Sequence, residues 1–180
     1  MGQLSTDKEY QLVRYQERIL TSFIFHYLTY EGLRAKRDRL KGEEKFWIYT
    51  SNAHVFQCFN YWCMVFGADS NETHWKHLSF NNDKGSEGFK KELLQELNIS
   101  ASEWNVTWRE MTTFRNQFTA HRDTSFNKPV PYMDNAYKAA LVYIKWIKKK
   151  LPYINWPSLE GWIEKQKIVV QETVKHLIEE

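Results

Sequence analysis

Apolar residues recur every three or four positions through most of this chain, the spacing that lines one face of an α-helix. The pattern predicts a first helix over 6–32, which could continue through the basic segment 34–41, and a second helix over 46–66. The second helix is apolar on nearly every side, which indicates a central position among packed helices. Gly42 closes the first helix, Glu43 and Glu44 open the second, and Gly67 ends it.

The rest of the chain also predicts helices, separated by polar or proline-containing segments. Residues 68–85 are rich in Asp, Asn, Ser and Gly and predict a loop with one helical turn near Trp75. Two prolines in 124–131 must end any helix that arrives there. Further helices are expected over 86–97, 132–151 and 157–177. We therefore expect an all-α protein, with 152–180 forming a C-terminal helix that packs on the same domain as 1–151.

The stretch 100–123 is the most informative part of the sequence. Ser100 and Glu103 have the spacing of a capping box, which starts a helix. The large apolar residues that follow recur at steps of three and four: Trp104, Trp108, Met111, Phe114 and Phe118. These residues form one apolar stripe along the predicted helix, and such a stripe lies either in a core or in an interface.

Two charged or titratable residues interrupt this stripe. At about 100° per residue, Arg115 and Arg122 project close to its middle, and His121 projects to its edge. A guanidinium on a buried face costs several kcal/mol unless it is paired, so Arg115 needs an anion, either a carboxylate or a phosphate. Arg115 and His121 lie about 9 Å apart along an ideal helix, so they meet one small anion only if Arg115 reaches far or the helix ends near His121.

This pair of residue types suits metal-free cleavage of RNA. The reaction needs a base for the 2′-hydroxyl, an acid for the leaving 5′ oxygen and a cation for the phosphate, and His and Arg supply these roles. One Arg and one His make half of such a site. If two chains packed through the apolar stripe, two copies of Arg115 and His121 would line a single cleft.

Composition narrows the classes of function. The chain has 180 residues, 42% of them hydrophobic, which fits one domain with a sizeable core. Aromatic residues make up 16%, which suits a thick core plus a dimer interface. A net charge of +3 excludes a strong basic field, so any RNA contact is local. Cys58 and Cys63 lie in an apolar run, which is typical of reduced thiols in a protein core. The sequence shows neither a signal-peptide pattern nor an apolar run long enough to span a membrane. We therefore expect a cytoplasmic protein without membrane contact.

His74 and His77 offer a third type of site. They lie three residues apart in the loop 68–85, but a metal site needs three or four convergent ligands and this segment lacks a specific ligand motif. The preferred interpretation is a loop that packs Trp75 against the core with histidines at its edge. A helical metal-dependent enzyme built on these two histidines is the third hypothesis, and no metal or other cofactor is expected.

The segment Arg115 to Asp123, RNQFTAHRD, resembles the signature of the HEPN superfamily: an Arg, a polar residue, a few variable positions and then a His near the end of a helix. The form RNxxxAHRD is most similar to the abortive-infection branch, as is the upstream segment GADSNETHWKHL. With the predicted helices, this resemblance implies an all-α, HEPN-like up-and-down bundle of four to five main helices. It further implies a homodimeric, metal-independent endoribonuclease with a composite active site at the dimer cleft. Such a protein acts as a toxin or in phage defence, beside a neutralising antitoxin.

The resemblance also assigns roles to the residues of the motif. His121 would be the proton-transfer residue, Arg115 the phosphate clamp, and Asn116 would orient the site or bind substrate. Arg122 would add to the phosphate grip, and Asp123 would pair with an Arg or orient His121. The alternative is a non-catalytic helical module of the same fold, which binds RNA or a protein partner and uses Arg115 to hold a phosphate or a carboxylate.

Overall fold

The structure, a computed structural model, describes residues 6–78, 86–120, 127–152 and 157–178. Within these ranges the chain forms six α-helices and no strand: α1 (Thr6–Arg34), α2 (Glu44–Phe66), α3 (Ser86–Leu97), α4 (Ala101–Phe114), α5 (Asp134–Lys150) and α6 (Leu159–Leu177). Short 3₁₀ turns occupy Arg37–Arg39 and Trp75–His77, and a π-helical turn, Arg115–Ala120, follows α4 directly. The expected all-α class is confirmed, with six helices in these ranges rather than four to five.

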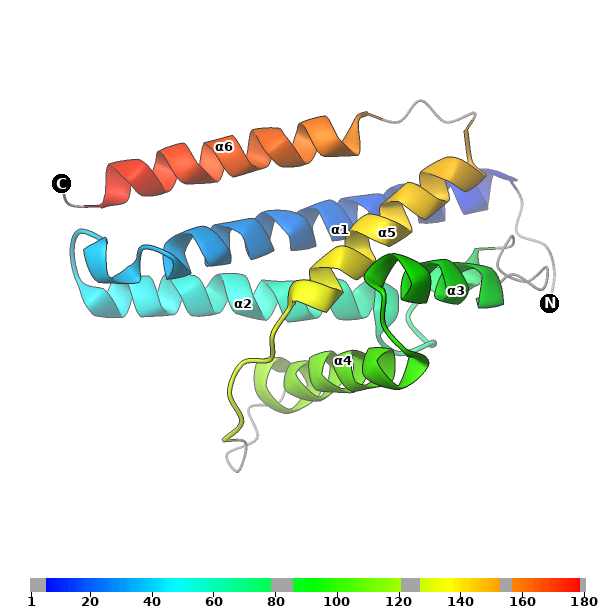
Figure 1. Cartoon of the computed structure of the whole chain (residues 1–180), viewed down its shortest axis with the longest axis horizontal. Helices are drawn as coiled ribbons and strands as arrows, with labels where there is room; N and C mark the ends of the chain where they lie inside the picture. Colours follow the sequence, from blue (N-terminus) through cyan, green and yellow to red (C-terminus); the bar gives the residue numbers. More distant parts are fainter. Residues whose placement is uncertain (1–5, 79–85, 121–126, 153–156, 179–180) are drawn as a thin grey trace.

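The two longest helices, α1 and α2, lie side by side and run in opposite directions (Figure 1). The outer side of α1 carries α6, while α5 crosses α1 and packs against α3. α4 lies along the opposite side of α2 from α1, and the end of α4 points toward the N-terminal half of α2 (Figure 1). None of the described helices is long and apolar enough to cross a membrane.

The main core is unusually aromatic, because α2, α3 and α5 meet through large rings. Phe89 of α3 contacts Tyr143 and Trp146 of α5 with ring centroids 4.9 and 5.3 Å apart, and Phe66 of α2 contacts Tyr143 at 5.5 Å. The buried residues of α2 begin only at Val55. The expected central position of α2 therefore holds for its C-terminal half, whereas its N-terminal half is largely exposed.

One buried amide ties three segments together at the centre of the molecule. The fully buried Gln16 of α1 donates from Nε2 to the carbonyl oxygens of Thr73 and His74, at 3.1 and 3.2 Å. Its Oε1 accepts a hydrogen bond from the Tyr143 hydroxyl at 2.8 Å. Every polar group that Gln16 buries is therefore satisfied, and the loop after α2 is fixed against α1 and α5.

A small second cluster attaches α6 to α1. Gly32 lies inside α1 rather than at its end, and a Cβ on Gly32 would come within 2.7 Å of Val170 of α6. Glycine here permits the close approach of the two helices. Helix α6 thus packs against α1. α1 itself ends at Arg34, so its extension through 34–41 was wrong: a 3₁₀ turn and Gly42, at φ 95°, reverse the chain there.

Candidate functional site

The motif helix α4 begins as the sequence predicts. Ser100 Oγ accepts a hydrogen bond from the Glu103 backbone N–H at 3.2 Å, and the Glu103 carboxylate accepts one from the Ser100 backbone N–H at 2.7 Å. This capping box satisfies two of the donors that the first turn of a helix leaves unpaired. The start of α4, and with it the angular position of every residue up to Phe114, is set by these local contacts.

The apolar stripe of α4 packs within its own chain. Trp104, Met111 and Phe114 are buried in the main core, and the Phe114 ring lies 4.3 Å from the Phe59 ring of α2. Trp108 is 38% exposed and donates from its indole N–H to the Phe66 carbonyl at 2.7 Å. The stripe is thus a core element rather than the interface between two chains, and a dimer would have to form through another surface.

Helix α4 does not continue as an α-helix into the motif but widens into a π-helical turn, Arg115–Ala120. The Thr119 hydroxyl donates to the Arg115 carbonyl at 2.8 Å and is 3.2 Å from Oδ1 of Asn60 on α2. Phe118 contacts the rings of Phe114 and Phe56, with centroids 5.1 and 5.5 Å apart. The turn is therefore fixed to α2 by one polar and one aromatic contact, and π-turns of this kind are frequent at functional sites.

Arg115, the first residue of this turn, is half-buried. Its Nη1 donates to Oδ1 of Asn116 at 2.9 Å, and its Nε is buried without any hydrogen-bond partner in the described structure. No carboxylate within the described ranges forms an ion pair with Arg115, so of the two predicted partners the carboxylate is not found there. A partly buried guanidinium with a free N–H is a strong site for an incoming anion.

The thiol of Cys63 lies near Arg115 but does not take part in such chemistry. Burial raises its pKa to about 12, and the positive charge of Arg115 opposes that rise only in part. Its Sγ contacts the Met111 carbonyl oxygen at 3.8 Å. Burial likewise raises the pKa of Cys58. Both cysteines are buried, free and protonated near neutral pH, as expected for core thiols.

Three of the five candidate residues, His121, Arg122 and Asp123, lie outside the described residues. The structure therefore brings together Arg115 and Asn116, while the expected approach of His121 to Arg115 stays a prediction. The π-turn changes the geometry on which that expectation was based, because residues after Phe114 no longer follow the 3.6-residue period.

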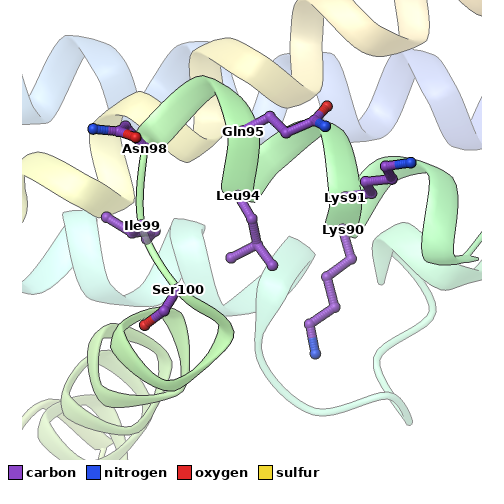
Figure 2. A pocket seen from close by; sticks show the side chains of 7 residues that line it. All are labelled: Lys90, Lys91, Leu94, Gln95, Asn98, Ile99 and Ser100. Atoms are coloured by element: carbon purple, nitrogen blue, oxygen red, sulfur yellow. The ribbon is translucent and has the colours of Figure 1, made fainter.

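Hollows lie at both ends of α4. A groove of about 460 Å³ runs between the last turns of α4 and the segment 128–132, and it is lined by Arg109, Glu110, Thr113, Phe114, Lys128, Pro129, Val130, Pro131 and Tyr132. It lies beside Phe114, at the end of α4 that carries the motif. A wider hollow of about 690 Å³ lies at α3 and the start of α4, where the side chains of Lys90 and Leu94 point to the same side of α3 (Figure 2). The first hollow is lined by Phe114, the residue before Arg115.

His74 and His77 make polar contacts within the loop after α2. His74 is buried, its Nδ1 accepts a hydrogen bond from the Lys76 backbone N–H at 3.3 Å, and its Nε2 lies 3.4 Å from the Asp69 carboxylate. Burial lowers the pKa of His74 to about 4, which keeps the ring neutral. His77 Nε2 lies 2.9 Å from the Asn71 carbonyl oxygen. Among the residues searched, no group of three or more potential ligands is assembled.

Sequence reasoning missed a second pair of histidines. His26 of α1 and His54 of α2 approach through their Nδ1 atoms at 2.8 Å, and the Tyr61 ring stacks on His26. Burial lowers the pKa of both imidazoles, and for His26 the neighbouring His54 adds to this effect. The two residues are 28 positions apart, so only the register between the antiparallel helices could have revealed the pair.

No protein-family model matches the chain, and comparisons with curated proteins and with solved structures gave no significant match. What this protein does must therefore be inferred from its own residues.

Proposed function

We propose that the chain is a metal-independent endoribonuclease that holds the scissile phosphate with Arg115. The supporting observation is the state of this side chain: its Nε is buried without an acceptor, and no ion pair within the described ranges uses its charge. An unpaired, half-buried arginine is unfavourable in a purely structural role. A phosphate supplies the opposite charge that Arg115 lacks within the described ranges, and the planar guanidinium suits two parallel hydrogen bonds to it.

The rest of the proposed chemistry depends on the residues beside Arg115. His121 follows the π-turn directly in the sequence and transfers the proton of the 2′-hydroxyl or of the leaving 5′ oxygen. Asn116 holds the guanidinium in place through its Oδ1. Arg122 adds positive charge near the phosphate, and Asp123 pairs with an arginine or orients His121. No metal is needed, because the guanidinium itself stabilises the charge that develops on the phosphate.

A single copy supplies one arginine and one histidine, so the full reaction uses two copies of the chain. Since the apolar stripe of α4 is part of the core, we place the interface of the homodimer on another surface. We further propose that the enzyme acts in the cytoplasm as a toxin or a phage-defence effector, HEPN-like in fold, beside a neutralising antitoxin protein.

The second candidate function is RNA binding without cleavage by a module of the same fold. The positive charge of Arg115, which no ion pair within the described ranges uses, suits a bound phosphate whether or not a reaction follows. Because the two functions share this contact, binding alone does not separate them.

Cleavage of a labelled, structured RNA in the presence of EDTA separates the two functions. The wild-type protein should produce 2′,3′-cyclic ends, and Arg115→Ala and His121→Ala should each lose this activity at unchanged native mass. Arg14→Ala is the matched control, because Arg14 lies on α1 outside the motif and is paired with Glu17 at 2.8 Å. Binding without cleavage by the wild type would support the non-catalytic module, and cleavage by the Arg115 variant would refute the proposed site.

A further inference from the structure

The face of α2 that holds the Arg115 turn extends well beyond it. Tyr49, Phe56 and Asn60 are seven and four residues apart and share one face of α2. Phe56 contacts Phe118, and Asn60 is bonded to Thr119, so the π-turn covers this part of the face. Toward the start of α2 the same face is exposed at Tyr49 and Asn52, in the half of α2 that extends beyond the end of α4 (Figure 1).

The uncovered part of this face presents aromatic rings to solvent. Tyr49 is 72% exposed and Phe46 is 59% exposed, although neither lies at a chain end. Between them and Phe56 the face carries the exposed polar residue Asn52. We name the residues Lys45, Phe46, Tyr49 and Asn52 the α2 track. Its two rings are among the most exposed aromatic side chains in the described ranges, together with Tyr132 and Tyr15.

Positive charge is concentrated at the same end of the molecule. The segment 34–45 holds six basic residues (Arg34, Lys36, Arg37, Arg39, Lys41 and Lys45) and three acidic ones (Asp38, Glu43 and Glu44), a net +3 that equals the net charge of the whole chain. Lys36, Lys41 and Lys45 are exposed, and within the described ranges none of them has a carboxylate at ion-pair distance. Within the described ranges, the charges of these three lysines are therefore not used in an ion pair.

We propose that the α2 track binds a single-stranded RNA segment that leads to Arg115. Exposed rings stack on bases whatever their identity, and lysines that neutralise phosphates add affinity that depends on salt. From Lys45 to Asn60 the face spans 15 residues, or about 22 Å, which is room for a few nucleotides. RNA as the ligand rests on the proposed function, whereas the position of the track rests on exposure and charge alone.

A second copy of the chain fits this surface less well. A two-fold interface sets the same patch against itself, so the excess of positive charge in 34–45 would face an identical excess. The α2 track also mixes its two rings with a lysine and an amide side chain, so it presents less apolar area than the core of a stable homodimer interface. A polyanion complements both features.

The test measures binding of an RNA that cannot be cleaved. A 2′-O-methyl single strand lacks the reacting hydroxyl, so its affinity for the full-length protein reports binding without chemistry, and a hairpin of equal length serves for comparison. Tyr49→Ala should weaken binding of the single strand about tenfold, and Tyr49→Phe should keep it. Lys45→Ala should lower the slope of affinity against salt by about 0.7. The control is Tyr15→Ala, which removes another exposed tyrosine. Tyr15 lies in the N-terminal half of α1, whereas the track begins after the C-terminal end of α1.

The results separate this inference from the proposed nuclease. The inference is overturned if Tyr49→Ala binds as the wild type does, if Tyr15→Ala loses as much affinity, or if Tyr49→Ala instead halves the native mass, which would mean that a second copy covers the track. If the strand binds through Tyr49 but ordinary RNA is never cleaved, the track stands and the nuclease fails. If RNA is cleaved and Tyr49 does not matter for binding, the nuclease stands and the track fails.

Discussion

Arg115 donates from Nη1 to Oδ1 of Asn116 at 2.9 Å, while its own Nε is buried without an acceptor. The neighbouring side chain thus fixes the guanidinium by one of its five N–H groups and leaves a second one desolvated and unused. A structural arginine normally stabilises the fold through the ion pairs and hydrogen bonds that it makes within the protein. A phosphate-binding arginine instead leaves some of its N–H groups unbonded until the ligand binds.

This state predicts that Arg115 contributes little to folding. Replacing it with alanine should change the free energy of unfolding by no more than about 0.5 kcal/mol, because the unsatisfied Nε is removed together with the charge. Urea unfolding of both proteins measures the difference. Arg115→Lys should be equally stable but inactive on RNA, since an ammonium lacks the planar fork. A loss above about 2 kcal/mol would instead identify Arg115 as a member of a structural ion pair.

Thr119 should act as a positioning residue for the π-turn. Thr119→Val removes the hydrogen bonds to the Arg115 carbonyl and to Asn60 but keeps the volume of the side chain. We expect it to lower stability by about 1 kcal/mol and to reduce RNA cleavage further than this loss explains, because the turn that carries Arg115 is no longer fixed to α2. Thr119→Ser keeps the hydroxyl and should restore cleavage. Equal cleavage by the valine and serine variants would argue against this role.

The sequence predicted the features that depend on neighbours along the chain. The capping box at Ser100, the end of α2 at Gly67 and the helical turn at Trp75 follow from local hydrogen bonding and from residues that stop helices, and all three are present. The π-turn was not predicted, because an α-helix and a π-helix differ by less than one residue per turn. The contacts that select the wider turn, at Thr119 and Phe118, involve residues of α2 that are about 60 positions away.

Long-range packing also explains the other differences. Gly32 looks like a helix stop in the sequence, yet it lies within the last turn of α1, where it admits α6. The N-terminal half of α2 is rich in apolar residues but lies beyond α4, so Phe46 and Tyr49 face solvent. Neither feature can be read from periodicity, because both depend on which helices are neighbours in space.

Stability should fall in mild acid because of His74. Burial lowers the pKa of this imidazole from 6.5 to about 4, so the unfolded chain binds the proton more readily than the folded one. The contribution is fully present above pH 6.5 and is lost as the pH falls toward 4, by up to about 1.4 kcal/mol per pH unit. His26 and His54 act in the same direction.

His74→Asn isolates this contribution. Asparagine keeps an acceptor for the Lys76 backbone N–H but cannot be protonated in this range, so the variant should lose less stability than the wild type between pH 6.5 and 4. Urea unfolding at several pH values gives both slopes. Identical slopes for the two proteins would show that His74 does not control the acid response.

Because Gly32 lies so close to Val170, we expect alanine to be less favourable than glycine at position 32, the reverse of the usual preference in helices. Alanine normally stabilises a helix interior by about 1 kcal/mol over glycine. Here the new Cβ would lie 2.7 Å from a Val170 methyl carbon, so Gly32→Ala should destabilise the protein by about 1–2 kcal/mol as α6 is pushed away from α1. In the double variant with Val170→Ala the obstructing methyl is gone. Adding Gly32→Ala to Val170→Ala should therefore be neutral or stabilising in thermal unfolding, and if the glycine change is equally harmful in both backgrounds, the contact with α6 is not its cause.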